Sequence, residues 1–179
     1  MSLSWESHRD ITNVLHRFHW YFNAGRFDEM GKLFAHATLT TLYSWATDTP
    51  LTYRGEAEVA DAYRRSVRLY DGLPRVQYSV SNVVIDGDEE AGTANVWSQY
   101  QGLHGAEVSW ASPHGVTPEH YDAPPIQVFS AGRYEDTFER IHGAWSVTKR
   151  ICHADFTGDR SGHMSVDLLT ADAGPDAPR

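Results

Sequence analysis

The hydrophobic pattern of this chain changes its period once, near Pro74, and that change constrains the fold more than any other feature. Before it, apolar residues recur every three or four positions, as from Ile11 to Phe22, which is the spacing of an amphipathic helix. After it, apolar and polar residues alternate, as from Val76 to Val80, which is the spacing of a half-buried strand. Helices followed by strands predict an α+β fold with an antiparallel sheet.

Three helices are predicted in the N-terminal half of the chain. The first ends at Gly25, a residue that readily takes the left-handed conformation of a helix cap. The second begins at about Phe27, and the third covers residues 56–70, where the turn residues Asp71-Gly-Leu-Pro74 stop it. Residues 39–45 and a short segment through Tyr53 are predicted to be strands between the second and third helices.

Four longer strands are predicted in the second half. A turn is expected at residues 86–88 and a tight turn at His142-Gly143. Residues 104–124 are rich in Gly, Pro and His and are expected to form a long functional loop. Helices packed on one face of such strands should curve the sheet into a half-open cone around a pocket for a small, largely apolar molecule. The four strands are residues 76–84, 91–103, 126–140 and 144–155.

The charge balance excludes some classes of partner. The net charge of the chain is -9, and no run of Lys and Arg exceeds a pair. Nucleic acids and anionic membranes are therefore unsuitable partners, because both need clustered positive charge. The single cysteine, Cys152, rules out a disulfide within the chain. No apolar run approaches the roughly 18 residues of a membrane span, and the first residues lack the apolar core of a signal peptide, so a cytoplasmic protein is expected.

A single domain is predicted over residues 1–156, and its packed part is expected to run from about Arg9 to Asp155. The remaining residues, 157–179, are rich in Gly, Asp, Ala and Pro. This composition is typical of a tail without a core of its own. We expect the tail to pack on the domain or on a neighbouring subunit.

Four segments together resemble the SnoaL-like domain family of the nuclear transport factor 2-like superfamily. The resemblance covers roughly residues 8–156, and it depends on the order and spacing of short pieces that are each unspecific. These pieces are Gly25-Arg-Phe-Asp28, Tyr53-Arg-Gly55, Ser130-Ala-Gly-Arg-Tyr134 and Gly143-Ala-Trp145 ahead of Lys149-Arg150.

The resemblance implies a cone fold and two kinds of function. Similar enzymes include polyketide cyclases, scytalone and bile-acid dehydratases and ketosteroid isomerase, which transfer protons on cyclic or fused-ring substrates. Similar non-catalytic members include the small subunits of ring-hydroxylating dioxygenases, whose role is mainly structural. A lyase or isomerase of this kind is expected to be independent of a cofactor, so no cofactor is predicted. Fold alone does not choose between these functions.

Three positions depart from the dehydratase pattern of that family. The Asp near the end of the first helix corresponds here to Asn23, which cannot accept a proton at neutral pH. The His at the start of the first long strand corresponds to Tyr78, which can donate a hydrogen bond but is a poor base near pH 7. A tyrosine earlier on the helix corresponds to Phe18. We expect Asn23 and Phe18 to contact a substrate and Tyr78 to donate a hydrogen bond to it.

Two histidines remain as candidates for acid–base chemistry. His153 alternates with Trp145, Val147 and Ile151, so it is expected on the apolar face of its strand, with Asp155 two residues later to orient its ring. His104 ends the strand that carries Trp97 and Tyr100, and it approximately matches a second His of the scytalone dehydratase pattern. A hydrogen-bonded structural role is the alternative for each histidine.

Other residues are expected to line the pocket or to play no part in it. Phe22, Tyr43 and Trp97 are predicted substrate-binding residues. His16 and His19 have a spacing that can bind metal, but no convincing third ligand lies beside them, so no metal site is predicted. Cys152 alternates to the face opposite His153 and is not expected to be a catalytic thiol.

Two hypotheses therefore remain. The first is an acid–base lyase or isomerase acting on a cyclic, aromatic or polyketide-like substrate, with His153 as base, Asp155 orienting it, and Tyr78 and His104 as donors. The second is a non-catalytic binding or assembly module that resembles a dioxygenase small subunit. In either case a homodimer or higher homo-oligomer is expected, because the outer face of the sheet needs cover.

Overall fold

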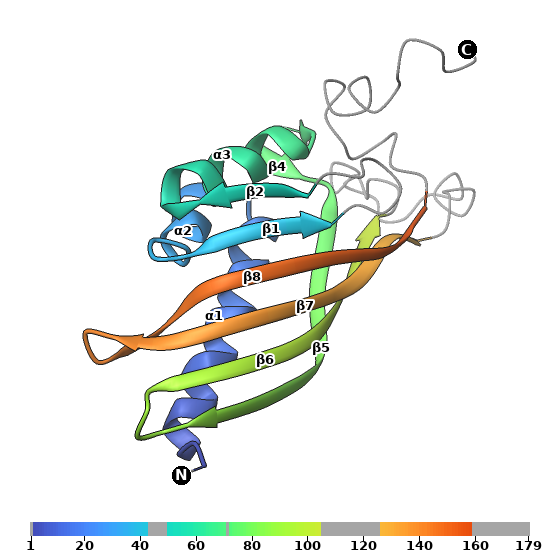
Figure 1. Cartoon of the computed structure of the whole chain (residues 1–179). Coiled ribbons are helices and arrows are strands. Elements are labelled where there is room, and N and C mark those ends of the chain that lie inside the picture. Colours follow the sequence, from blue (N-terminus) through green and yellow to red (C-terminus); the bar gives the residue numbers. More distant parts are fainter. Residues whose placement is uncertain (1, 43–49, 71, 105–125, 159–179) are drawn as a thin grey trace, which may run out of the picture.

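The structure, a computed structural model, describes residues 2–42, 50–70, 72–104 and 126–158. Three helices precede the long strands, as the change of period predicts. One curved, unclosed sheet carries the helices on its concave side (Figure 1). The expected α+β cone with its helices in the N-terminal half is therefore confirmed. The predicted loop at 104–124 and the tail at 157–179 lie almost entirely outside the described residues.

The first helix, α1 (Trp5–Asn23), begins upstream of the expected Arg9. The hydroxyl of Ser4 accepts a hydrogen bond from the backbone N–H of Ser7 at 3.2 Å, and this cap starts the helix before its apolar stripe begins. Gly25 ends the turn that follows, with a φ of +68° that suits glycine. A Cβ atom at this position would lie 2.7 Å from the carbonyl oxygen of Gly72, so the site also requires the absence of a side chain.

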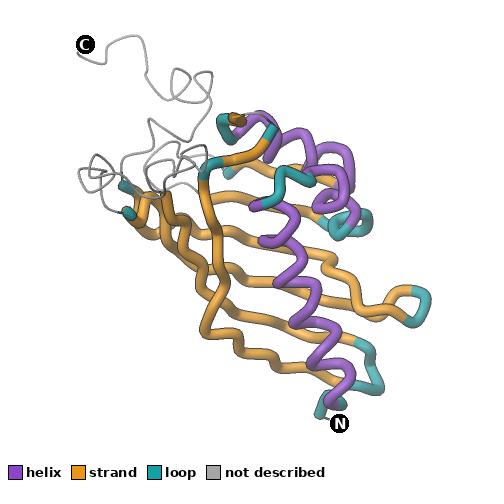
Figure 2. The backbone as a smooth tube through the Cα atoms, turned by 180° about the vertical axis from the view of Figure 1, so that it is seen from behind, coloured by secondary structure: helices purple, strands orange, loops and turns teal. Residues whose placement is uncertain are grey.

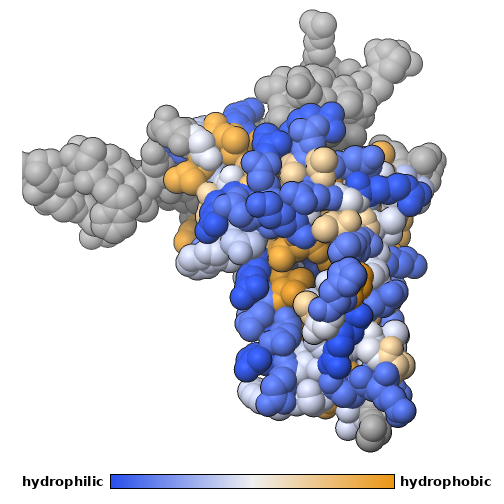
Figure 3. Space-filling view, turned by 90° about the vertical axis from the view of Figure 1, so that its left-hand side faces the viewer, coloured by the Kyte–Doolittle hydropathy of each residue, from blue (hydrophilic) through white to orange (hydrophobic). Residues whose placement is uncertain are grey.

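The other two helices, α2 (Phe27–Lys32) and α3 (Gly55–Ser66), pack closely against each other. A Cβ atom at Gly31 would lie 2.8 Å from the Cβ atom of Ala60, which shows how near the two backbones come. Helices α2 and α3 cover one edge of the sheet, and α1 crosses the centre of the sheet (Figure 2). Figure 3 shows that the surface on this side is mainly hydrophilic, with apolar residues gathered in a recess between two hydrophilic bands.

The third helix is shorter than the expected 56–70. It stops at Ser66 because Val67, a β-branched residue, takes extended angles of −120° and 140°. The next residues form a small hairpin of β3 (Leu69–Tyr70) and β4 (Leu73–Pro74). Gly72, with a φ of +83°, supplies the left-handed residue of its turn.

Within the described residues, six strands form the main sheet in the order β2-β1-β8-β7-β6-β5. The prediction of a purely antiparallel sheet is wrong at one place, because β1 and β8 run parallel. These two strands are separated by most of the chain and are not joined by a hairpin, so antiparallel pairing is not required. The strands are β1 (Thr38–Leu42), β2 (Leu51–Arg54), β5 (Val76–Asp88), β6 (Thr93–His104), β7 (Gln127–Ile141) and β8 (Ala144–Thr157).

The core fills the space between α1 and the concave face of the sheet. The helix buries every third or fourth residue, as the sequence pattern indicates, and a fully buried Leu or Phe side chain contributes about 1.5–3 kcal/mol. The main members from α1 are Ile11, Leu15, Phe18 and Phe22, and those from the sheet are Leu39, Val96, Tyr100, Tyr134, Phe138 and Val147.

A β-bulge in β5 exchanges the two faces for the residues that follow it. Ser81 pairs with Gln99 but Val84 pairs with Trp97, so β5 contains one extra residue, and Asn82 there has a φ of +50°. Val84, expected to share a face with Tyr78, is therefore exposed on the outer face. The strand also continues through the expected turn at 86–88, and the chain turns at Gly92 instead.

A second bulge, in β8, decides which residues face the interior. Val147 pairs with Phe138 and Lys149 pairs with Thr137, so Thr148 is the extra residue. Because a shift of one residue exchanges the two faces of a strand, the buried positions change from odd to even at this point. The buried residues are Trp145 and Val147 before the bulge and Arg150, Cys152 and Ala154 after it.

Candidate functional site on the concave face

Aromatic rings gather on the concave face where β5 begins and β6 ends. The ring of Tyr78 lies 5.0 Å from that of Phe22, 5.5 Å from that of Phe129 and 6.0 Å from that of Tyr100. Gly102 makes this packing possible, because a Cβ atom there would lie within 3.0 Å of both Phe129 and Tyr78. Rings packed in this way form a stable apolar wall.

His104 belongs to the same face. The inward residues of β6 have even numbers from Ala94 to Gly102, and His104 continues that alternation opposite buried Val76. Its half-buried ring lies 6.1 Å from that of Phe129. The structure therefore brings His104 and Tyr78 to one end of the concave face.

Asn23 is engaged by the backbone of β5. Its side-chain amide donates to the carbonyl oxygen of Tyr78 at 2.9 Å, and its side-chain oxygen accepts from the N–H of Tyr78 at 2.8 Å. Asn23 thus pairs with the strand as another strand would, and it fixes the end of α1 to the start of β5. This pair of bonds explains the amide at a position where the dehydratase pattern has a carboxylate, because a carboxylate could not donate to the carbonyl oxygen.

The predicted lining residues divide between the two faces of the sheet. Phe22 contacts Tyr78, and Phe18 lies deeper, against Phe34 and Tyr134. The expectation for Trp97 is wrong in its placement. Successive side chains of a strand point to opposite faces, and Trp97 lies three positions before the inward residue Tyr100. Trp97 is therefore on the outer face, where it is 45% exposed. Tyr43 lies outside the described residues.

His153 and Asp155 are also on the outer side rather than on the expected apolar face. The Thr148 bulge separates them from the face of Trp145 and Val147. The Nε2 atom of His153 lies 2.9 Å from a carboxylate oxygen of Glu135, and its Nδ1 atom lies 3.2 Å from Arg133. Arg133 in turn pairs with Asp155 at 2.5 Å. Asp155 therefore pairs with Arg133 and is not placed to orient His153.

The interior contains an ion pair between Asp136 on β7 and Arg150 on β8. Both residues are almost fully buried, and Arg150 donates to the two carboxylate oxygens of Asp136 at 2.7 Å each. The guanidinium group also lies over the rings of Phe18 and Tyr134, at 4.5 and 4.4 Å from their centroids. Burial raises the pKa of Asp136 and opposes the charge of Arg150, but each charge favours the other. The sequence contains one indication that Asp136 is buried, because it alternates with Tyr134 and Phe138 on an apolar strand face.

His19 lies beside this pair, whereas its neighbour His16 is exposed. Its Nδ1 atom is 3.0 Å from the carbonyl oxygen of Leu15, and its ring is 5.7 Å from that of Tyr134. Burial, together with the positive charge of Arg150, lowers the pKa of His19 to about 3. The ring is therefore neutral at physiological pH.

Cys152 faces the same interior. Its sulfur lies 3.9 Å from the hydroxyl of Tyr100, and that hydroxyl lies 3.5 Å from Ser130. Burial raises the pKa of the Cys152 thiol to about 12, so the thiol stays protonated. This protonation makes the thiol a poor nucleophile.

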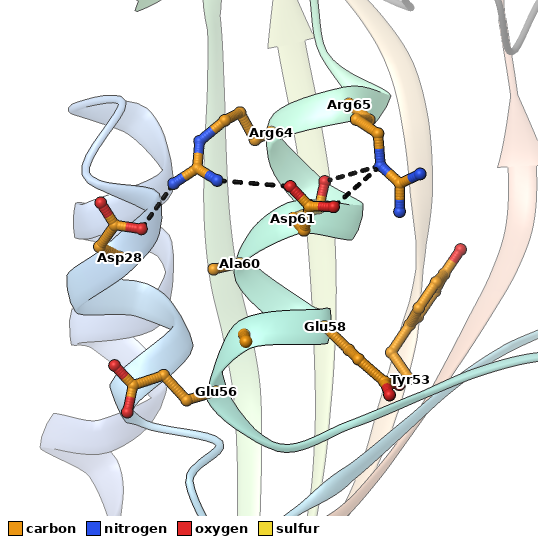
Figure 4. A pocket seen from close by; sticks show the side chains of 9 residues that line it. Asp28, Tyr53, Glu56, Glu58, Ala60, Asp61, Arg64 and Arg65 are labelled. Carbon is orange, nitrogen blue, oxygen red and sulfur yellow. Dashed lines mark hydrogen bonds and ion pairs between the residues drawn. The ribbon is translucent and has the colours of Figure 1, made fainter.

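A separate shallow pocket of about 750 Å³ lies on the outside, over α2 and α3 (Figure 4). Both of its arginines already pair with aspartates of the same pocket. Arg64 contacts Asp28 at 2.5 Å and Asp61 at 3.5 Å, and Arg65 contacts Asp61 at 3.4 Å. We therefore place the candidate site on the concave face and not here.

Two further searches concern the described part of the chain. Within it, no group of three His, Cys, Asp or Glu side chains is arranged to hold a metal ion. No helix in the same residues has the length and apolar character needed to cross a membrane.

Comparison with known proteins agrees with the fold. The family profile described as the SnoaL-like domain matches residues 4–151. No curated protein matches the chain significantly. Among solved structures, a protein of unknown function with a cystatin-like fold from Nostoc punctiforme is similar, with 15% identity and a TM-score of 0.62, covering 87% of this chain and 96% of the other.

Two similar structures from Novosphingobium aromaticivorans carry functional names. A protein provisionally named scytalone dehydratase has 18% identity and a TM-score of 0.56, covering 85% of this chain and 86% of its own. The β subunit of a provisionally named aromatic-ring-hydroxylating dioxygenase has 14% identity and a TM-score of 0.58, covering 84% and 90%. At these identities the likeness establishes the fold and leaves the function open.

Proposed function

The chain belongs to the SnoaL-like domain family, and from that premise we propose that its concave face binds a small cyclic or aromatic molecule and acts on it as an acid–base lyase or isomerase. One observation carries the proposal. His104 lies on the same face as the aromatic wall of Phe22, Tyr78 and Phe129. A wall of rings binds the substrate by its faces, and an imidazole beside it can transfer a proton.

In this proposal His104 takes the role first assigned to His153. The imidazole of His104 would remove a proton from a carbon next to a carbonyl group. The hydroxyl of Tyr78 would donate a hydrogen bond to the carbonyl oxygen, on which negative charge grows as the proton leaves. The proton held by His104 then returns to another carbon, which is isomerisation, or to a leaving hydroxyl, which is dehydration.

The test is exchange of hydrogen for deuterium next to the carbonyl of cyclic ketones in D₂O, followed by NMR. We expect His104→Ala to lower the exchange rate by about 10²-fold or more, which is typical for loss of a general base. His153→Ala is the matched control, because this histidine lies on the outer side of the sheet. Exchange that persists in His104→Ala, or that falls equally in both variants, would refute the role of His104.

A second candidate function is an assembly module, and the outer face of the sheet favours it. Val84 and Trp97 are register partners there, and Trp97 also pairs with Glu135. Both apolar side chains are substantially exposed. Exposed apolar rows of this kind mark protein interfaces. We propose that this row, Val84–Trp97–Glu135, contacts a second copy of the chain in a homodimer.

The assembly function and the enzyme function predict different results on purification. An assembly module should copurify with a larger, iron-containing subunit when the protein is isolated from its native host. A homodimer is expected under both functions, so the absence of a larger subunit, together with proton exchange that depends on His104, would exclude the assembly function.

A further inference from the structure

Three buried polar atoms around Tyr134 have no hydrogen-bond partner among the described residues. They are Nε2 of His19, Nη1 of Arg150 and Oγ of Ser98. The exposed fractions of the three residues are 4%, 1% and 2%. Buried polar groups are nearly always paired, so three orphaned atoms in one interior indicate a shared polar partner.

The three residues come from different elements and meet at one ring. The ring of Tyr134 lies 5.7 Å from that of His19 and 4.4 Å from the guanidinium carbon of Arg150. Ser98 on β6 is the direct register partner of Tyr134 on β7. Directly paired residues in antiparallel strands have Cβ atoms about 4.5–5.5 Å apart, so Ser98 also borders this ring.

The orphaned atoms differ in what they can offer. His19 must donate from Nδ1, because the atom near it is the carbonyl oxygen of Leu15. Its Nε2 atom therefore carries a lone pair and accepts. Arg150 uses Nε and Nη2 for Asp136, so Nη1 is a donor. The Ser98 hydroxyl can act in either way.

The charge of the cluster limits the partner further. The carboxylate of Asp136 neutralises Arg150, and His19 is uncharged. A carboxylate partner would be repelled by the lone pair on Nε2 of His19 and by the negative charge of Asp136. An ammonium group would be repelled by the positive charge of Arg150. A neutral group that donates once and accepts twice satisfies all three atoms, and a hydroxyl group is the smallest group that does so.

We propose that His19, Ser98 and Arg150 form a hydroxyl-binding subsite at the floor of the concave face, in which a ligand hydroxyl donates to Nε2 of His19 and accepts from Nη1 of Arg150. This inference rests on the proposed function, because the ligand must enter from the aromatic wall. Tyr100 connects the two regions, since its ring stacks on Tyr134 at 4.7 Å and lies 6.0 Å from that of Tyr78. A water molecule has the same hydrogen-bonding chemistry, so the test must separate the two sources.

The experiment compares three ligands that differ at one ring position: naphthol, methylnaphthalene and naphthoate. Binding to the full chain is measured by calorimetry or by ligand-observed NMR. We expect naphthol to bind about tenfold more tightly than methylnaphthalene, because only naphthol has a hydroxyl group for the subsite. A tenfold difference in affinity corresponds to about 1.4 kcal/mol. Naphthoate should bind more weakly than either. The preference for naphthol should fall to about twofold or less in His19→Phe and in Ser98→Ala, because each change removes one partner.

Two control variants carry the same substitutions elsewhere. His153 lies on the outer side of the sheet and Ser81 is exposed on β5. The variants His153→Phe and Ser81→Ala should therefore keep the preference for naphthol over methylnaphthalene. Ser98→Ala removes a single oxygen and keeps the test valid if His19→Phe does not fold. Arg150 is left unchanged because its loss would strand the charge of Asp136.

The remaining outcomes overturn the inference in distinguishable ways. If methylnaphthalene binds as tightly as naphthol, the aromatic site stands, but the polar atoms are held by water only and the subsite is refuted. If the preference for naphthol survives in both variants, its hydroxyl binds elsewhere and the subsite is again refuted. If none of the aromatic ligands binds, the proposed function fails and the subsite fails with it.

Discussion

At the scale of single residues, Asp136 and Arg150 place two opposite charges in an aromatic interior. Such a pair is costly to bury and far more costly to break, because the remaining charge has no partner. We expect Asp136→Ala to lower the free energy of unfolding by about 3–5 kcal/mol. The double variant Asp136→Leu with Arg150→Met should recover most of this loss. Urea denaturation measures both, and a loss below about 1 kcal/mol in the single variant would contradict the prediction.

Glu89 predicts how stability changes in acid. Its carboxylate accepts from the backbone N–H of Ser4 at 2.9 Å and from the hydroxyl of Ser7 at 3.1 Å, and it pairs with Arg140. These bonds lower the pKa of Glu89 from 4.5 to about 2. Because the folded pKa is the lower one, the stabilisation is complete above about pH 4.5 and disappears as the pH falls toward 2.

Glu89→Gln should therefore be less stable than the unmodified protein at pH 7, and the difference should shrink below pH 4.5. Thermal unfolding followed across the pH range measures this difference. Glu90→Gln is the matched control, since Glu90 is exposed next in sequence and no hydrogen bond or ion pair of its carboxylate is seen among the described residues. A difference between the Glu89 variant and the unmodified protein that stays constant from pH 7 to pH 2 would disprove the linkage.

At the scale of elements, the sequence predicted which segments are strands better than which faces they present. Tyr78 shares its face with Val76, as alternation indicates, because β5 and β6 pair regularly there. The same reasoning failed for His153, since the extra residue Thr148 is chemically ordinary and gives no local signal of a bulge. The faces of β8 depend on pairing with β7, which is a property of the sheet and not of the strand alone.

Two glycines of the sheet should respond differently to a methyl group. A Cβ atom at Gly132 would lie 1.9 Å from the backbone oxygen of His153, whereas one at Gly102 would lie 2.8 Å from the ring of Phe129. A ring can turn aside but a paired backbone cannot. We expect Gly102→Ala to cost about 1–3 kcal/mol, as overpacking usually does, and Gly132→Ala to cost clearly more. Denaturation midpoints decide the order, and a reversed order would be inconsistent with this packing.

At the scale of the whole molecule, the order of helices and strands was enough to predict the cone. The parallel contact of β1 and β8 could not be predicted, because nothing in Thr38–Leu42 indicates which distant strand it joins. The buried cluster of Asp136, Arg150 and His19 was missed for a similar reason. Its members come from β7, β8 and α1, and only the assembled cone brings them together.

The exposed row on the outer face leads to a prediction about oligomeric state. If Val84 and Trp97 contact a second copy, a charge at the centre of the row should separate the copies. We expect the unmodified protein to have the mass of a dimer and Trp97→Arg that of a monomer, both by light scattering at micromolar concentration. Asn13→Arg, on the exposed side of α1, should remain dimeric. A monomeric unmodified protein would refute the interface.

The amide of Asn23 also has a consequence for how this chain can evolve. Because it both donates to and accepts from the backbone of Tyr78, replacement by Asp would lose the donor and set a carboxylate against a carbonyl oxygen. A single change to Asp at position 23 would therefore weaken the anchor of β5 at the same time as it adds a carboxylate. The start of β5 would first need another anchor. The contact that fixes the helix to the sheet thereby restricts which side chains position 23 can carry.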